Sequence, residues 1–222
     1  RGDFLNMTAL ICGSRFGRGL VRPGGVAFDL EDSRRAQLLE RLDAARQDVT
    51  TAVDLLWDSP SVLARFQETG RVDRETAVDL GLVGVAARAC NIERDVRHEF
   101  PTGIYRLAHI PVSMAEAGDV FARAFVRWLE IQRSLAFIQD QLRSLPSGGN
   151  RAAAKPLGRS RIAVSLVEGW RGEICHMAMT DEAGRLAAYK IVDPSFHNWT
   201  GLAMALRNQQ ISDFPLCNKS FN

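Results

Sequence analysis

The amino-acid sequence predicts a mainly α-helical protein with a small antiparallel β-sheet, an α+β fold. Two long stretches repeat apolar residues at helical spacing, one beginning near Asp32 and one near Ser113. After Ser160 the apolar residues alternate instead, which is typical of strands. The 222 residues, 46% hydrophobic and 24% charged, suffice for a large core in one domain or in two tightly packed halves.

Composition argues against several classes of protein. No apolar run approaches the roughly 20 residues that span a bilayer, and Arg1-Gly2-Asp3 does not resemble the start of a signal peptide. The formal net charge is only +2, and no Lys/Arg block is interleaved with aromatic residues. We therefore expect a soluble cytoplasmic protein with no direct membrane insertion and no nucleic-acid partner.

The first half of the chain is predicted to be helical. Residues 3–11 form one helix, and the sequence Arg-Pro-Gly-Gly-Val at 22–26 forces a turn. A longer helix starts at Asp32 or Ser33 and ends before Pro60. Its apolar positions form one stripe: Leu38, Leu42, Ala45, Val49, Ala52 and Leu56.

Two shorter helical regions follow. A short helix starts at Ser61 and is closed by Gly70. In residues 71–90, Asp73 is a suitable N-cap, and Gly81 and Gly84 divide the segment into two short helices.

The second long helix is predicted to start at a capping box formed by Ser113 and Glu116. Its apolar face continues to about Ser144, which gives roughly thirty residues and a length of about 45 Å. That face consists of Phe121, Phe125, Trp128, Ile131, Leu135, Ile138 and Leu142. Residues 145–160, rich in Gly, Pro and Ala, form a loop.

Three strands are predicted after this loop, at 161–167, 173–179 and 186–192, with a hairpin turn at 181–184. A helix follows at about 200–209. A strand out and a strand back return the chain to its starting edge, so Arg171 and Ser195 are expected to be neighbours. We predict a helical region at 1–145 and a sheet with a C-terminal helix at 146–222, in one continuous domain excised from a longer chain.

The segment EGWRGEICH at 168–176 places two carboxylates, an arginine, a thiol and an imidazole within nine residues. It is either the rim of an active site or a polar turn between two strands. Four further segments accompany it in order: RPGGV at 22–26, the glycine-rich helical segment at 71–97, DPSFHNWTGLAMAL at 193–206 and DFPLCNKSFN at 213–222. Together the five resemble the large subunit of nickel-iron hydrogenases and the quinone-proximal subunit of respiratory complex I. The resemblance is greatest to formate hydrogenlyase-type large subunits, and it implies a hydrogenase-like helical body.

The resemblance also suggests site residues. An arginine in the family's Glu-x-x-Arg-Gly motif projects over the bimetallic centre, and by position this residue is Arg171. The Pro-Ser/Thr pair that donates a hydrogen bond to a cyanide on iron is Pro194-Ser195 here, and Asn198 keeps a nearby polar position. Glu168 and Glu173 are candidates to relay protons, although Glu168 can instead orient Arg171.

The resemblance implies metal ligands that this segment lacks. The family binds nickel and iron through two C-x-x-C pairs, and none of Cys12, Cys90, Cys175 and Cys217 forms such a pair. We expect these cysteines to be reduced and buried, with no metal site in the fragment.

Two functions remain open. The parent chain is either a hydrogenase large subunit with a nickel-iron centre or a metal-free, complex I-like subunit that couples electron transfer to quinone; the isolated fragment is expected to be inactive. The expected partners are an iron-sulfur small subunit and membrane subunits, which would hold the chain peripherally at the inner face of the membrane.

Overall fold

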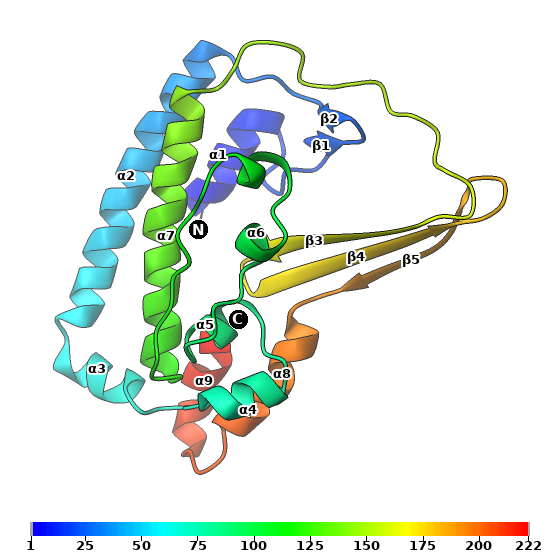
Figure 1. Cartoon of the computed structure of the whole chain (residues 1–222). Helices are drawn as coiled ribbons and strands as arrows, with labels where there is room; N and C mark the ends of the chain where they lie inside the picture. Colours follow the sequence, from blue (N-terminus) through cyan, green and yellow to red (C-terminus); the bar gives the residue numbers. More distant parts are fainter. Residues whose placement is uncertain (1, 222) are drawn as a thin grey trace. The chain divides into compact units, whose positions relative to one another are not determined.

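Helices make up most of the regular structure, and short antiparallel strands form two separate sheets (Figure 1). The computed structural model describes residues 2–221. Its helices are α1 (Gly2–Cys12), α2 (Asp32–Trp57), α3 (Pro60–Phe66), α4 (Arg74–Asp79), α5 (Gly84–Arg88), α6 (Val96–Glu99), α7 (Val120–Arg143), α8 (Ser195–Ala205) and α9 (Phe214–Phe221), with 3₁₀ turns η1 (Gly103–Arg106) and η2 (Ile211–Asp213). Its strands are β1 (Val21–Arg22), β2 (Gly25–Val26), β3 (Ile162–Gly169), β4 (Gly172–Thr180) and β5 (Leu186–Val192). The predicted α+β class is confirmed.

The chain divides into two compact units, one made of residues 1–55 and 134–156 and the other of residues 56–133 and 157–222. In the first unit the predicted turn at 22–26 is the β1–β2 hairpin. The loop that follows α7 pairs with this hairpin, because Val26 N donates to Asn150 O at 3.0 Å and Ala152 N donates to Gly24 O at 2.9 Å. A side chain at Gly24, whose φ is +93°, would lie 2.1 Å from Ala152 O, so glycine is required there.

The first unit also contains contacts between the two long helices. Gln139 Nε2 on α7 donates to Asp43 Oδ1 on α2 at 2.7 Å, and Arg46 Nη2 donates to Gln139 Oε1 at 3.3 Å. The predicted stripe on α2 is shorter than expected. Leu38, Leu42 and Ala45 are buried, whereas Ala52 is exposed.

The start of the long helix differs from the prediction, because α7 begins at Val120 and has 24 residues. Gly118 has a φ of +65°, a left-handed conformation that ends helical continuity before Val120. The helix is capped by Asp119, whose Oδ1 accepts from Ala122 N at 2.7 Å. Ser113 is buried elsewhere, with its hydroxyl accepting from Arg133 Nη1 at 2.8 Å.

In the second unit, β3, β4 and β5 form one antiparallel sheet in that order (Figure 1). Gly169 pairs with Gly172, so only Trp170 and Arg171 join β3 to β4. Cys175 pairs with Val192, which brings the end of β5 to the same end of the sheet. The chain then enters α8, which begins at Ser195 rather than at the predicted Thr200 because Asp193 Oδ1 accepts from Ser195 N at 2.8 Å.

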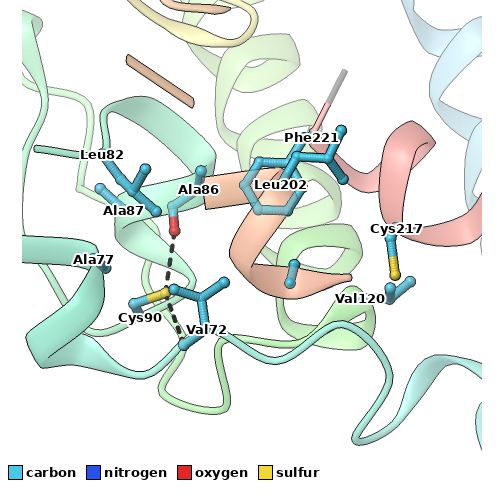
Figure 2. Packing of buried hydrophobic residues seen from close by; sticks show 11 residues of the cluster. Val72, Ala77, Leu82, Ala86, Ala87, Cys90, Val120, Leu202, Cys217 and Phe221 are labelled. Atoms are coloured by element: carbon cyan, nitrogen blue, oxygen red, sulfur yellow. Dashed lines mark hydrogen bonds between the residues drawn. The ribbon is translucent and has the colours of Figure 1, made fainter. Parts of the chain in front are cut away.

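Short helices enclose the core of the second unit. Asp73 caps α4 as predicted, and Gly81 and Gly84 separate α4 from α5. Figure 2 shows the buried cluster, in which the Cys90 thiol donates to the carbonyl oxygens of Val72 and Ala86. The cluster consists of Val72, Ala77, Leu82, Ala86, Ala87, Cys90, Val120, Leu202, Ala205, Cys217 and Phe221. It joins α4 and α5 to α7, α8 and α9, and thereby fixes the elements that surround the end of the sheet.

Candidate functional site

The turn between β3 and β4 lines a pocket of about 130 Å³. Arg171 lies in this turn, and Ser195 and Asn198 come from the first turn of α8. The same pocket is lined by Trp199, Asn218 and Phe221. The structure therefore brings Arg171 and Ser195 together, as the antiparallel path of the strands predicted.

Asn198 fastens this turn to the rest of the unit and is only 3% exposed. Its Oδ1 accepts from Val83 N at 3.0 Å. Its Nδ2 donates to Val83 O and to Arg171 O, both at 3.2 Å. One amide side chain thus joins the residue before α5 to the backbone of Arg171. The sequence singled out Asn198 for a role at the site, but its bracing contacts depend on the tertiary fold.

The backbone of α5 packs against the same turn without a side chain between them. A Cβ on Gly84 would lie 2.3 Å from Arg171 O and 2.3 Å from the Cα of Gly172. Both glycines have positive φ, +61° for Gly84 and +135° for Gly172. Close backbone packing therefore determines where Arg171 leaves the sheet.

The residues before α8 add a negative charge to the site. Pro194 is the N-cap residue of α8, and Asp193 precedes it. Hydrogen bonds from Ser195, together with the charge of Arg171, hold the pKa of Asp193 below its usual range. Asp193 was not among the site residues predicted from the sequence. An Asp-Pro dipeptide just before a helix is the signal that could have found it, because its carboxylate accepts from the first amide of α8.

Glu168 lies three residues before Arg171 but is bonded to a different arginine. Its Oε1 accepts from Arg88 Nη1 at 2.8 Å, and its Oε2 accepts from Val96 N at 3.2 Å. From the sequence, Glu168 was predicted either to relay protons or to orient Arg171. In the structure it is the buried end of an ionic network that starts on α5.

The network contains two arginines and three carboxylates from four elements. Arg88 on α5 lies 3.6 Å from Asp95 and 3.7 Å from Glu130. Arg97 on α6 pairs with Asp95 and donates to Glu130 Oε2 at 2.7 Å. Burial alone raises the pKa of Asp95, but hydrogen bonds from Arg97 and the charges of Arg88 and Arg97 outweigh burial, so its pKa lies below the usual range.

Another arginine, Arg127 on α7, lies near this region without a carboxylate hydrogen bond among the described residues. Its Nη1 donates to Arg123 O at 3.3 Å, and its guanidinium carbon is 6.0 Å from the centre of the Trp170 ring. Burial, with repulsion from Arg123, Arg171 and Arg88, lowers the pKa of Arg127 to about 10. Arg127 thus remains protonated at neutral pH.

The remaining candidates lie outside the pocket. Glu173 is half-buried on β4, directly opposite Glu168 in the strand register. His176 Nδ1 is 2.5 Å from the hydroxyl of Tyr189, and His197 packs against Phe196. Neither histidine lines the pocket.

The described residues do not fit the coordination sphere of a metal ion. Within residues 2–221, no group of three or more His, Cys, Asp or Glu side chains converges to hold one. Cys12, Cys90 and Cys217 are buried, and Cys175 is half-buried. Burial raises the pKa of Cys90 to about 11 and also raises that of Cys217, which keeps both thiols protonated. Residues 2–221 therefore supply polar groups around a pocket and no cluster of three or more such ligands.

Known proteins with similar sequences are subunits of oxidoreductases. The chain is 30% identical over 213 residues to the carbon monoxide-induced hydrogenase of Rhodospirillum rubrum, covering 96% of this chain and 59% of that protein. It is 30% identical over 216 residues to formate hydrogenlyase subunit 5 of Escherichia coli, covering 97% of this chain and 38% of that protein. It is 27% identical over 240 residues to NADH-quinone oxidoreductase subunit 4 of Thermus thermophilus, covering 96% of this chain and 59% of that protein. The class is thus that of the hydrogenase-like and complex I-like oxidoreductase subunits.

A family profile described as "Respiratory-chain NADH dehydrogenase, 49 Kd subunit" matches residues 1–161. The chain belongs to this family. A solved structure of the membrane-bound sulfane sulfur reductase, an archaeal respiratory membrane complex, contains a chain with the same fold, with a TM-score of 0.92 at 22% identity. The match covers all of this chain and 62% of that one. The chain therefore spans less than two thirds of the length of these relatives. In the part that the structure describes, no helix is long and apolar enough to cross a membrane.

Proposed function

We propose that the chain is part of a hydrogenase large subunit of the formate hydrogenlyase type. The intact subunit would oxidise or produce H₂ at a nickel-iron centre and pass electrons to iron-sulfur clusters. The observation that carries this proposal is the pocket in which Arg171, Ser195 and Asn198 converge from the β3–β4 turn and α8. Relatives named as a hydrogenase and as a formate hydrogenlyase subunit, each 30% identical, support it.

The chemistry of the pocket residues suits this role. The Arg171 guanidinium stays charged and offers several directed donors, which can hold a small ligand in one orientation. Ser195 adds a hydroxyl, which both donates and accepts. Pro194 and Asn198 fix the geometry, the first at the start of α8 and the second by its bonds to the Arg171 and Val83 backbone. A nickel-iron centre would supply the redox chemistry, with its ligands provided from outside residues 2–221.

A second candidate function is a metal-free subunit that couples electron transfer to quinone. It is favoured by the family description as an NADH dehydrogenase subunit and by the relative named as an NADH-quinone oxidoreductase subunit. In that case Arg171 and its neighbours would recognise a polar headgroup or shape the interface with an electron donor. Metal content of the intact protein separates the two candidates.

Both candidates imply the same partners. The relatives and the structural neighbour are subunits of multi-subunit complexes, so we propose an iron-sulfur small subunit and membrane subunits as partners of this chain. Through them the protein would sit peripherally at the cytoplasmic face of the membrane. Purification of the intact protein as a lone monomer would contradict this arrangement.

The hydrogenase proposal is tested by Arg171→Lys in the intact protein. Lysine keeps the positive charge but loses the planar fork of donors, so most H₂ turnover should be lost, roughly 10²-fold or more, while nickel and iron content stay unchanged. Arg185→Lys is the matched control, because Arg185 is an exposed arginine beside the turn at the opposite end of the same sheet. Unchanged turnover in Arg171→Lys would show that Arg171 is only a strand-turn residue.

A further inference from the structure

The ionic network that includes Arg88 and Glu168 contains more carboxylates than guanidinium groups. Three carboxylates, those of Asp95, Glu130 and Glu168, share the guanidinium groups of Arg88 and Arg97. The Arg88 and Asp95 side chains are each 2% exposed and that of Glu168 is 5% exposed. Unpaired charge at such depth is costly, and one proton on a carboxylate would remove the excess negative charge among these five side chains.

Two atoms of the network remain without hydrogen bonds among the described residues. They are Arg88 Nε and Glu130 Oε1, both buried. Glu130 Oε1 lies 3.7 Å from Arg88 Nη2, too far for a hydrogen bond. Arg88 therefore has unused donor capacity and a second carboxylate within reach if its bond to Glu168 weakens. The network has room for a second arrangement.

The three carboxylates are held differently. Asp95 accepts from the backbone and side chain of Arg97 and lies near Arg88, and these contacts keep it ionised. Glu130 accepts from Arg97. Glu168 has one guanidinium bond and one amide bond, and burial raises its pKa above the usual value of 4.5, with Asp95 adding to the rise and Arg88 opposing it. Glu168 is thus the carboxylate that combines a raised pKa with a direct hydrogen bond to Arg88, the last residue of α5.

Arg88 also connects Glu168 to the candidate site through α5. The last residue of α5 is Arg88, which is bonded to Glu168 and to Arg94 O at 2.9 Å. The first residue of α5 is Gly84, which packs on the backbone of Arg171 and Gly172. One five-residue helix therefore contacts the end of the β3–β4 hairpin at two points, Glu168 on β3 and the backbone of Arg171 and Gly172 at the turn.

We propose that Glu168 is a proton acceptor that controls how tightly α5 packs against the turn between β3 and β4. A proton from solvent binds the Glu168 carboxylate and neutralises it, the ion pair with Arg88 weakens to a neutral hydrogen bond, and Arg88 moves toward Glu130. The α5 helix then loosens its hold on the Arg171 turn. The proton enters where Glu130 and Arg97, with side chains 12% and 13% exposed, approach the surface.

Other charged groups near Glu168 do not replace it in this role. Glu173 lies opposite Glu168 in the register of β3 and β4 and is half-buried. Arg127 on α7 interacts with Arg88 and with Arg171 by charge repulsion, and it carries no carboxyl group that could take up a proton. The inference goes beyond the proposed function, because proton binding at Glu168 does not depend on whether the intact protein handles hydrogen or quinone.

The test is a pH titration of the intact protein labelled with ¹³C at the glutamate side-chain carboxyls. We expect one glutamate to titrate above the ordinary value of 4.5. This signal should be lost in Glu168→Gln and in Glu168→Asp, the second of which keeps a carboxylate for Arg88 if the first does not fold. Glu173→Gln, the cross-strand neighbour, is the matched control and should keep the signal. The proposal is overturned if every glutamate titrates at or below its ordinary value, or if the raised signal survives in Glu168→Asp.

The packing of α5 against the turn has a second readout in Trp170, which stands in the turn between Gly169 and Arg171 and is 56% exposed. Its fluorescence is obtained as the difference between the protein and its Trp170→Phe variant. We expect the Trp170 fluorescence to change with pH at the same midpoint as the Glu168 titration. In Glu168→Asp the Trp170 fluorescence should stay constant over the same pH range. If the Trp170 fluorescence of the wild-type protein did not change with pH, the proposed link between Glu168 and the turn would be overturned.

Discussion

Asp95 shows how strongly single buried residues stabilise the second unit. Its carboxylate caps α6 by accepting from Arg97 N at 2.9 Å, and it pairs with the guanidinium groups of Arg97 and Arg88. Its side chain is 2% exposed, so solvent screens these interactions little. Asparagine would place an amide donor where a carboxylate oxygen now accepts from Arg97, so the buried guanidinium would lose a charged partner.

We expect Asp95→Asn to lower the free energy of unfolding by about 3 kcal/mol at neutral pH. The pKa of Asp95 is lowered in the folded protein, so its stabilisation is complete above the ordinary value of 3.8 and is lost as the pH falls through the lowered pKa. The difference between wild type and Asp95→Asn should therefore narrow below pH 3.8. Denaturant unfolding at several pH values measures this, and a constant difference would contradict the assigned ion pairs.

Arg123 illustrates a residue whose role the sequence did not reveal. It is fully buried, and it donates to Ser220 Oγ, Gly118 O and Gly70 O at 2.7–2.8 Å. Its guanidinium carbon also lies 4.4 Å from the centre of the Phe221 ring. The helical stripe on α7 was read from apolar residues alone, but this buried arginine holds α9 in place, and α9 contributes Asn218 and Phe221 to the pocket.

At the scale of elements, α5 and the β3–β4 turn form the most constrained contact near the site. Gly84 and Gly81 both have left-handed backbone, with φ of +61° and +64°. Only Gly84 lacks space for a side chain, because its Cβ would lie 2.3 Å from Arg171 O, whereas nothing lies within 4 Å of a Cβ on Gly81. Substitution at Gly81 therefore measures the cost of the left-handed backbone alone, and substitution at Gly84 measures that cost together with the steric clash.

We expect Gly81→Ala to cost about 1–2 kcal/mol of stability, the cost of a left-handed conformation for alanine. Gly84→Ala should cost more than this, because the backbone of Arg171 and Gly172 must also move. Thermal or denaturant unfolding of both variants provides the comparison, and Trp170 fluorescence reports the turn. Equal losses of stability in the two variants would mean that the close packing of α5 on the turn is not maintained in solution.

The elements that the sequence predicted well are those with strong local signals. The β1–β2 turn, the Asp73 cap, the glycine break between α4 and α5 and the three-stranded sheet are all confirmed. The predicted start of α7 was wrong because the capping-box pattern at Ser113 also occurs in a loop. In that loop Arg133 donates to the serine hydroxyl. Gly118, between that pattern and the helix, was the local signal that decided the outcome.

The candidate site was only partly predictable for the same reason. Consecutive strands joined by short turns can be recognised in the sequence and run antiparallel. This path returns the chain to the same end of the sheet and placed Arg171 near Ser195. The partner of Glu168 was not predictable, because Arg88 lies 80 residues away in sequence and reaches it only through packing of α5 on the hairpin. Long-range ion pairs of this kind leave no spacing pattern in a single sequence.

At the scale of the whole molecule, the four thiols lie in separate parts of the fold. Cys12 ends α1, Cys90 follows α5, Cys175 is in the middle of β4 and Cys217 is in α9. Metal sites built from thiolates need deprotonated sulfur atoms that converge within a few ångströms. The thiols of Cys90 and Cys217 are kept protonated by burial, and both are used in packing the core.

We therefore expect the purified 222-residue chain to contain well under one equivalent of nickel or iron, measured by elemental analysis after removal of loosely bound metal. A variant with all four cysteines replaced by serine should give the same low background, because the thiols are not ligands. One equivalent in the wild-type chain that disappears in the serine variant would show that these thiols do form a centre. That result would favour a metal site built within this part of the protein over one whose ligands come from residues beyond it.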